Sequence, residues 1–133
     1  MTFSPVKLRA AAILGLSAVA LGAFGAHGLK SHWEATLTAS EVAYRLDIWK
    51  TASIYHLAHS IVLLVLAFAC PVPHQARIAS WSFVIGINIF SGSLYSIAIT
   101  GIKWFGAITP IGGVLLMLGW LLLAFLRNTS AKE

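Results

Sequence analysis

The segment VLLMLGWLLLAFL, residues 114–126, decides the class of this protein. It contains no charged residue, and a second run at residues 61–70, IVLLVLAFAC, has the same character. Strands that cross a membrane alternate between apolar and polar residues at every second position, and neither run does so. Both runs therefore predict helices that lie within a membrane.

The composition of the whole chain leads to the same class. Of the 133 residues, 59% are hydrophobic and only 10% are charged, and the mean hydropathy is +0.86. Soluble chains are about 45–50% apolar and about 25% charged. A disordered chain is excluded because such chains are poor in apolar residues. A soluble enzyme is excluded because so little polar surface could not cover a core this apolar.

The chain divides into segments that are long enough to cross a bilayer, since about 20 helical residues span about 30 Å. These spans lie at about residues 8–29, 49–70, 78–100 and 104–126. Pro71 and Pro73 end the second span, and Gly101 and Lys103 mark the turn before the fourth. Short connections place neighbouring helices antiparallel. We therefore expect an all-α membrane protein in which residues 1–133 form one antiparallel bundle of four transmembrane helices.

Only the connection from Lys30 to Lys50 is long. Thr38 and Glu41 have the spacing of a capping box, in which each side chain satisfies a free backbone N–H group of the other residue. Apolar residues follow at helical spacing, and Glu41 and Arg45 are placed as an i,i+4 ion pair. This pattern predicts a short amphipathic stretch that continues into the second span.

The basic residues indicate how the chain is oriented. They never occur three in a row, so they are better explained as anchors at the membrane surface than as contacts to nucleic acid. The side that holds both termini carries five of them, Lys7, Arg9, Arg77, Arg127 and Lys132. Three acidic residues, Glu34, Glu41 and Asp47, fall on the other side. The positive-inside rule then predicts that both termini are cytoplasmic.

Polar side chains gather in the half of the spans that lies nearer the outer surface. The candidates for a polar cluster in the bundle interior are His27, Tyr55, His59, Ser91, Ser93, Tyr95 and Thr109. A polar group that faces hydrocarbon loses its hydrogen bonds to water, so we expect these side chains to converge. They either form hydrogen bonds between helices or build a proton, metal or ligand site. His59 is the first choice for a central role, because imidazole both donates and accepts.

The sequence does not indicate an enzyme or a metal centre. His56 and His59 share a helical face, and two imidazoles can bind zinc or copper. However, no carboxylate lies in a span, either to balance a metal or to orient a catalytic histidine. A single cysteine, Cys70, excludes an internal disulfide. We therefore expect no catalytic residue, no cofactor and no metal.

Small residues in the spans predict close contacts between helices. The glycines to which we assign this packing role are Gly22, Gly25, Gly92, Gly112 and Gly113. Pro110, inside the fourth span, is expected to introduce a kink.

Several motifs occur in order along the chain. They are GAFGAHGL at 22–29, Thr51-Ala52 followed by Tyr55 and His59, FSGSLY at 90–95, TPIGG at 109–113, and Gly119-Trp120. Together they resemble the membrane-protein family known as domain of unknown function 423, whose animal relatives are called transmembrane protein 256-like. The resemblance implies a four-span protein of the bacterial cytoplasmic membrane and supplies no reaction. His56 and Ser60 depart from the glutamine-like and alanine-like residues of that family, which favours His59 over His56 as a functional residue.

Three classes of function stay open. The first is a non-enzymatic protein with a structural, envelope-supporting or regulatory role, such as a small accessory subunit. The second is a binder of a lipid, quinone or other small molecule at the polar half. The third is an oligomeric transporter or channel, since four spans alone do not readily enclose a pathway. The expected partners are the lipid bilayer and other membrane subunits or further copies of the chain, without nucleic acid.

Overall fold

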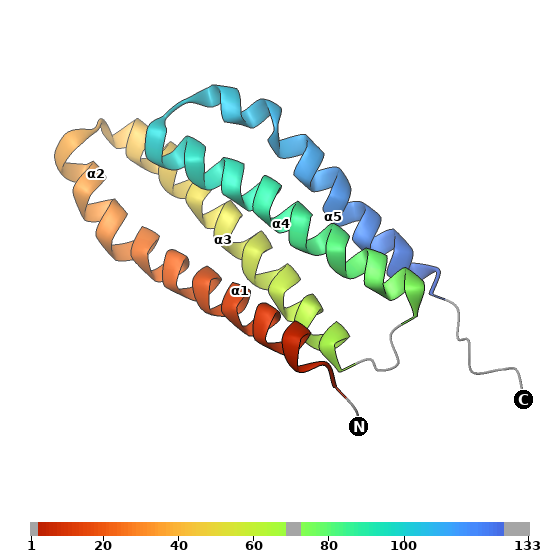
Figure 1. Cartoon of the computed structure of the whole chain (residues 1–133). Helices are drawn as coiled ribbons and strands as arrows, with labels where there is room; N and C mark the ends of the chain where they lie inside the picture. The colour runs from red at the N-terminus through yellow and green to blue at the C-terminus, as the bar shows by residue number, and fades with distance from the viewer. Residues whose placement is uncertain (1–2, 69–72, 127–133) are drawn as a thin grey trace, which may run out of the picture.

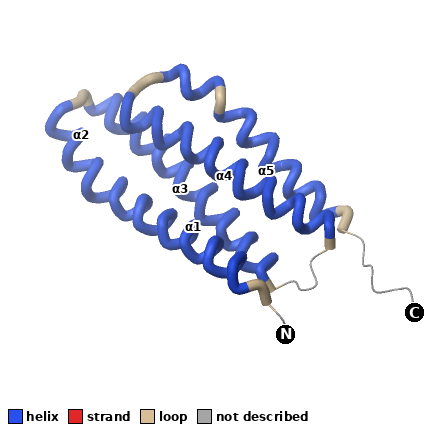
Figure 2. Tube along the Cα trace, viewed as in Figure 1, coloured by secondary structure: helices blue, strands red, loops and turns tan. Residues whose placement is uncertain are grey.

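A computed structural model describes residues 3–68 and 73–126, and these residues form helices joined by short turns (Figures 1 and 2). The elements are α1 (Pro5–Phe24), the π-helical turn η1 (Gly25–Leu29), α2 (Lys30–Thr36), α3 (Ala39–Ala67), α4 (His74–Thr100), the 3-10 helix η2 (Lys103–Ala107) and α5 (Thr109–Ala124). Cys70 and Pro71 lie outside the described residues.

Within the described residues, four helical runs are long and apolar enough to cross a membrane. They are Pro5–Thr36, Ala39–Ala67, His74–Thr100 and Lys103–Ala124. The predicted all-α fold with four spans is therefore confirmed. The helices are longer than the apolar segments. The additional residues are polar and belong to α2 and to the first turns of α3, at one end of the molecule.

The four spans form an open row (Figure 1). α1 packs against α3, α3 against α4, and α4 against α5, whereas the described parts of α1 and α5 make no backbone contact. Neighbouring helices run antiparallel, so α1 and α4 begin at the same end of the molecule (Figure 1). As a result, α3 and α4 form the centre of the row, and α1 and α5 form its flanks.

Two apolar clusters fill the row. The cluster nearer the first residues of α1 contains Ala11, Leu63, Leu66, Ala79, Phe83, Ile87 and Leu116. The cluster nearer α2 contains Leu29, Trp33, Val42, Trp49 and Ala98. Each cluster takes side chains from several helices, so the clusters hold the row together along its length.

The glycines differ in how closely they are packed. A Cβ added at Gly112 would overlap the backbone of Phe90, whose Cα would be 2.7 Å away. A Cβ at Gly25 would overlap the indole of Trp49. Gly22 and Gly113 make ordinary contacts, at 3.9 Å and 3.7 Å from the nearest side chain. The packing role expected of Gly92 is not realised within this chain, because nothing lies within 4 Å of a Cβ built there.

The start of α3 follows the local sequence. Thr38 is the N-cap residue, and its Oγ1 accepts a hydrogen bond of 3.4 Å from the N–H group of Glu41. The hydroxyl of Thr38 also lies 3.3 Å from a carboxylate oxygen of Glu41. The predicted helix start near Ser40 is therefore confirmed, since α3 begins at Ala39.

The predicted ion pair between Glu41 and Arg45 was wrong. Arg45 instead donates hydrogen bonds to the carbonyl oxygens of Ala98, at 3.1 Å, and Ile99, at 3.0 Å. These carbonyls belong to the last turn of α4, where they have no partner within the helix. The C-terminal end of a helix carries a partial negative charge, which favours a cation at this position.

The kink expected at Pro110 was also wrong. α5 begins at Thr109, so Pro110 occupies the first turn of the helix. A proline there costs no hydrogen bond, because the first N–H groups of a helix have no partner within it. The fourth span is interrupted just before the proline, because η2 ends at Ala107 and α5 begins at Thr109.

Candidate functional site

His59, on α3, connects two helices that do not touch through their backbones. Its ring is buried, and its Nε2 lies 3.1 Å from the indole Nε1 of Trp120 on α5. Its Nδ1 lies 2.8 Å from the carbonyl oxygen of Tyr55. An indole N–H group can only donate, so Nε2 accepts and Nδ1–H donates to the carbonyl. Both nitrogens of a neutral imidazole are therefore used, and His59 bridges α3 and α5.

The predicted serines on α4 bind the helices on either side. The hydroxyl of Ser91 is buried and donates to the carbonyl oxygen of Ala52 on α3 at 2.9 Å. The hydroxyl of Ser93 lies 2.7 Å from the hydroxyl of Thr109 at the start of α5. Ser91 therefore connects α4 to α3, and Ser93 connects α4 to α5.

Tyr95 makes a further contact between α4 and α3. Its hydroxyl donates to the hydroxyl of Ser53 at 3.2 Å, and its ring centroid lies 4.5 Å from that of Trp49. Ser53 in turn donates to the backbone carbonyl of Trp49 at 3.0 Å. This tyrosine therefore combines ring packing with a hydrogen bond.

Trp49 is a residue that the sequence analysis missed. It is 3% exposed, and its indole N–H donates to the carbonyl oxygen of Leu21 on α1 at 2.8 Å. Gly25 leaves space for the indole, since a side chain there would overlap it. A buried tryptophan needs an acceptor for its N–H group. A tryptophan in a predicted membrane span is therefore a candidate for a hydrogen bond between helices, and the sequence offered that signal. The bond joins α1 to α3.

Two predicted members of the cluster do not lie in the interior. His27, in η1, is exposed, and its backbone carbonyl accepts a hydrogen bond from the hydroxyl of Ser31 at 2.9 Å. Tyr55 is 44% exposed, and its ring packs on Phe90 at a centroid distance of 4.7 Å. His27 lies close to the polar end of the row, where an exposed imidazole can contact water. The expected convergence was wrong for these two residues.

His56 has a different environment from His59, although the two are three residues apart. Its Nε2 lies 3.4 Å from the hydroxyl of Ser17 on α1, whereas His59 bonds to a residue of α5. The Nδ1 of His56 is buried and has no hydrogen-bond partner among the described residues. The two imidazoles therefore face opposite flanks of the row. Among the described residues there is no group of three His, Cys, Asp or Glu that could hold a metal ion.

Together these bonds join helices rather than surround a space. They link α1 to α3, α3 to α4, α4 to α5, and α3 to α5. Each bond of this kind stabilises the association of membrane helices by about 0.6–2 kcal/mol. The geometry therefore defines a small polytopic membrane protein whose buried polar groups hold its spans in register.

The chain belongs to the family described as protein of unknown function DUF423, whose model matches residues 21–113. It is similar to a UPF0382 membrane protein of Staphylococcus saprophyticus, with 40% identity over 113 residues that cover 84% of this chain and 88% of the relative. It is 39% identical over 115 residues to the UPF0382 membrane protein YwdK of Bacillus subtilis, covering 84% of this chain and 87% of the relative.

A UPF0382 membrane protein of Haemophilus influenzae is also 39% identical over 115 residues, which cover 86% of each chain. No solved structure matches. The resemblance inferred from the motifs is thus confirmed, and the protein is an integral membrane protein of this family. All seven candidates for the polar cluster fall within the matched residues 21–113.

Proposed function

We propose that this protein is a non-enzymatic structural component of the bacterial cytoplasmic membrane. It acts as a small subunit of a membrane assembly in which α4 pairs with the α4 of a second copy. The observation that carries this proposal is an amide that is exposed in the middle of a span, the side chain of Asn88.

Asn88 lies about halfway along α4 and is exposed. Its amide nitrogen donates to the carbonyl oxygen of Val84, one turn back on the same helix, at 2.8 Å. A carboxamide has two N–H donors and an oxygen that accepts, so hydrogen-bonding capacity is left over on the outer face. In hydrocarbon that capacity costs free energy unless another protein group uses it. An exposed asparagine at this depth therefore favours contact with another transmembrane helix.

The residues around Asn88 would allow a second helix to come close. Gly92 and Ser96 follow Asn88 at intervals of four residues on α4. Nothing in this chain lies within 4 Å of a Cβ at Gly92, and the hydroxyl of Ser96 donates to the carbonyl of Gly92 at 2.8 Å. Small residues at this spacing let membrane helices approach. We call Asn88, Gly92 and Ser96 the Asn88 face.

A second copy is the occupant that the chemistry of this face favours. An amide both donates and accepts, so two Asn88 side chains related by a twofold axis can satisfy each other. The buried polar cluster supports a structural role as well, because its groups are used in bonds between helices. A ligand-binding or transport function at that cluster would need polar groups that are free to contact the ligand.

Replacing Asn88 with leucine should therefore weaken self-association. We expect the association constant of the dimer in mild detergent to fall roughly three- to thirtyfold, the range of one interhelical hydrogen bond in a membrane. The measurement is the mass distribution by native mass spectrometry over a protein dilution series. A cysteine introduced at position 92 should form a cross-link between two copies if their α4 helices are in contact.

The matched control is Met117→Leu, because Met117 is 64% exposed on α5, outside the Asn88 face. This control should leave the dimer fraction unchanged. A wild-type protein that stays monomeric at all concentrations would contradict the proposal, as would equal losses in both variants. Stoichiometric retention of a lipid or quinone that is lost with substitutions at His59 would support the ligand-binding alternative instead.

Membrane orientation is a separate part of this proposal. Lys7, Arg9 and Arg77 lie at the end of the row where α1 and α4 begin, and Glu34 and Asp47 lie toward the other end. By sequence, the side with both termini carries five of the nine Lys and Arg residues, whereas the other side carries four, Lys30, Arg45, Lys50 and Lys103. The positive-inside rule then favours cytoplasmic termini. A reporter fused after residue 133 should be active only as a cytoplasmic reporter. A periplasmic signal from the same fusion would show that the orientation is reversed.

A further inference from the structure

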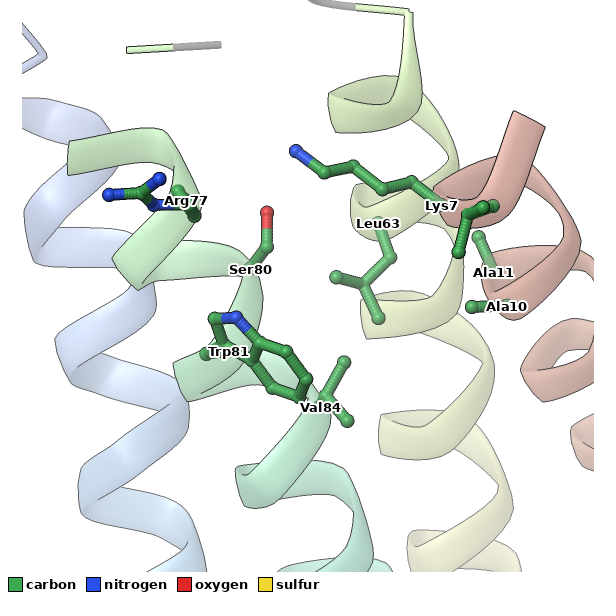
Figure 3. Close-up of a pocket in the computed structure, with 9 residues that line it drawn as sticks. Lys7, Ala10, Ala11, Leu63, Arg77, Ser80, Trp81 and Val84 are labelled. Carbon is green, nitrogen blue, oxygen red and sulfur yellow. The ribbon is translucent and has the colours of Figure 1, made fainter. Parts of the chain in front are cut away.

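A groove of about 220 Å³ lies between α1 and α4, at the opposite end of the molecule from α2. The side chain of Leu63 on α3 forms its floor (Figure 3). The residues that line it are Val6, Lys7, Ala10, Ala11, Leu63, Arg77, Ser80, Trp81 and Val84. The groove exists because the row is open at this face, where α1 and α4 stand apart on either side of α3.

The polarity of the groove changes along the helix axis. Lys7 and Arg77 belong to the first turns of α1 and α4, where the membrane surface is expected. From there inward, as far as Ala11 on α1 and Val84 on α4, the lining is apolar apart from Ser80, whose hydroxyl donates to the carbonyl of Ala76 on its own helix. At 1.5 Å per residue, the distance from Arg77 to Val84 along α4 is about 10 Å. A charged mouth above an apolar interior matches a phospholipid, which places its headgroup at the surface and its acyl chains in the core.

The electrostatics at the mouth favour a negative headgroup. Both charged residues that line the groove, Lys7 and Arg77, are basic, and the carboxylates of the described residues all belong to the segment from Glu34 to Asp47 at the other end. α1 and α4 both start here, and each helix start carries a partial positive charge. The residues that precede them, Ser4 and Pro73, make no side-chain cap to the first N–H groups.

We propose that this groove binds an anionic phospholipid. The ammonium of Lys7 contacts the phosphate, Arg77 adds long-range attraction, and an acyl chain lies against Ala10, Leu63 and Val84. In Figure 3, Lys7 extends toward the mouth of the groove, whereas the guanidinium of Arg77 points away from it. Lys7 is therefore the main headgroup contact. This site is distinct from the polar cluster and does not depend on the Asn88 face.

The test measures the thermal stability of the purified full chain in detergent during titration with phosphatidylglycerol or phosphatidylcholine of the same acyl chains. We expect phosphatidylglycerol to raise Tm at lower concentrations than phosphatidylcholine, because a ligand that binds the folded state stabilises it. Lys7→Gln should raise the apparent Kd for phosphatidylglycerol about fivefold, equivalent to about 1 kcal/mol for one cation near the membrane surface. Arg77→Gln should have a smaller effect in the same direction.

Two matched controls distinguish lipid binding in the groove from nonspecific attraction of the lipid to basic residues on the surface. Arg9→Gln removes a positive charge at the same end from a residue that does not line the groove, and should leave the Kd within about twofold of wild type. Ala10→Leu fills the groove and should weaken binding, whereas Ala12→Leu, at another exposed position of α1, should not. Circular dichroism of each variant without lipid reports whether it is folded.

Three results would overturn the proposal. They are equal effects of the two lipids on wild-type protein, an equal loss of affinity in Arg9→Gln and Lys7→Gln, and undiminished binding to the Ala10→Leu protein. If the Ala10→Leu protein does not fold, the comparison of Lys7→Gln with Arg9→Gln is enough to test the proposal.

Discussion

Gly112→Ala should lower the free energy of unfolding by about 3 kcal/mol, at the upper end of the usual cost of overpacking a core. The added Cβ would collide with the backbone of Phe90, where the Cα would be 2.7 Å away. A side chain could rotate away from such a collision, but the backbone of a helix cannot. α5 would have to move away from α4, which would also strain the bond between Ser93 and Thr109.

The measurement is a denaturation curve in mixed micelles, followed by the circular dichroism of the helices. Gly113→Ala is the matched control, because the same substitution at the next residue of α5 places its Cβ 3.7 Å from the ring of Phe90, an ordinary contact. The control should change the free energy of unfolding by less than about 1 kcal/mol, which is the difference in helix propensity between glycine and alanine. Equal destabilisation by the two substitutions would show that the helix contact at Gly112 is not the cause.

His59→Ala should also lower the free energy of unfolding by about 3 kcal/mol. The substitution opens a space against Phe83, whose ring centroid lies 5.5 Å from that of the imidazole. It also removes the acceptor for the indole N–H of Trp120 and the donor to the carbonyl of Tyr55. A polar group left without a partner costs about 1–3 kcal/mol. The contact between α3 and α5 should therefore weaken most.

A double-mutant cycle isolates the hydrogen bond from the loss of packing. Trp120→Phe removes the N–H donor and retains a ring, so the coupling with His59→Ala should be about 1 kcal/mol. His32→Ala removes the same type of side chain from an exposed position on α2 and should be nearly neutral. Additive effects of His59→Ala and Trp120→Phe would contradict the bridge. A folded His59→Ala protein with unchanged stability that has lost a bound small molecule would instead identify a ligand site.

The two stability predictions also concern the proposed function, because Gly112 and His59 both contact α4, at Phe90 and at Phe83 respectively. The contact at Gly112 and the bonds of Ser91 and Ser93 hold α4 between α3 and α5. With α4 held in this way, Asn88 faces outward and the groove beside Arg77 stays open. A variant that loosens α4 should therefore affect self-association and lipid binding together, whereas Asn88→Leu and Lys7→Gln should separate them.

The sequence by itself determined the features that depend on neighbouring residues and on the solvent. Apolar runs of sufficient length determined the four spans, because a backbone in hydrocarbon must satisfy its hydrogen bonds within the segment. Thr38 determined where α3 begins, since a cap acts on N–H groups only two or three residues away. The short turns determined that neighbouring spans are antiparallel.

Only the tertiary structure decided which polar groups meet. Arg45 has a carboxylate one turn away at Glu41, yet it bonds to carbonyls of α4 that are more than 50 residues distant. Trp49 bonds to Leu21 across 28 residues, and His59 to Trp120 across 61. Sequence spacing places side chains on one face of a helix but does not say which helix that face meets. That choice depends on how closely the backbones approach, as at Gly112 and Phe90, and so on the packing of all the spans together.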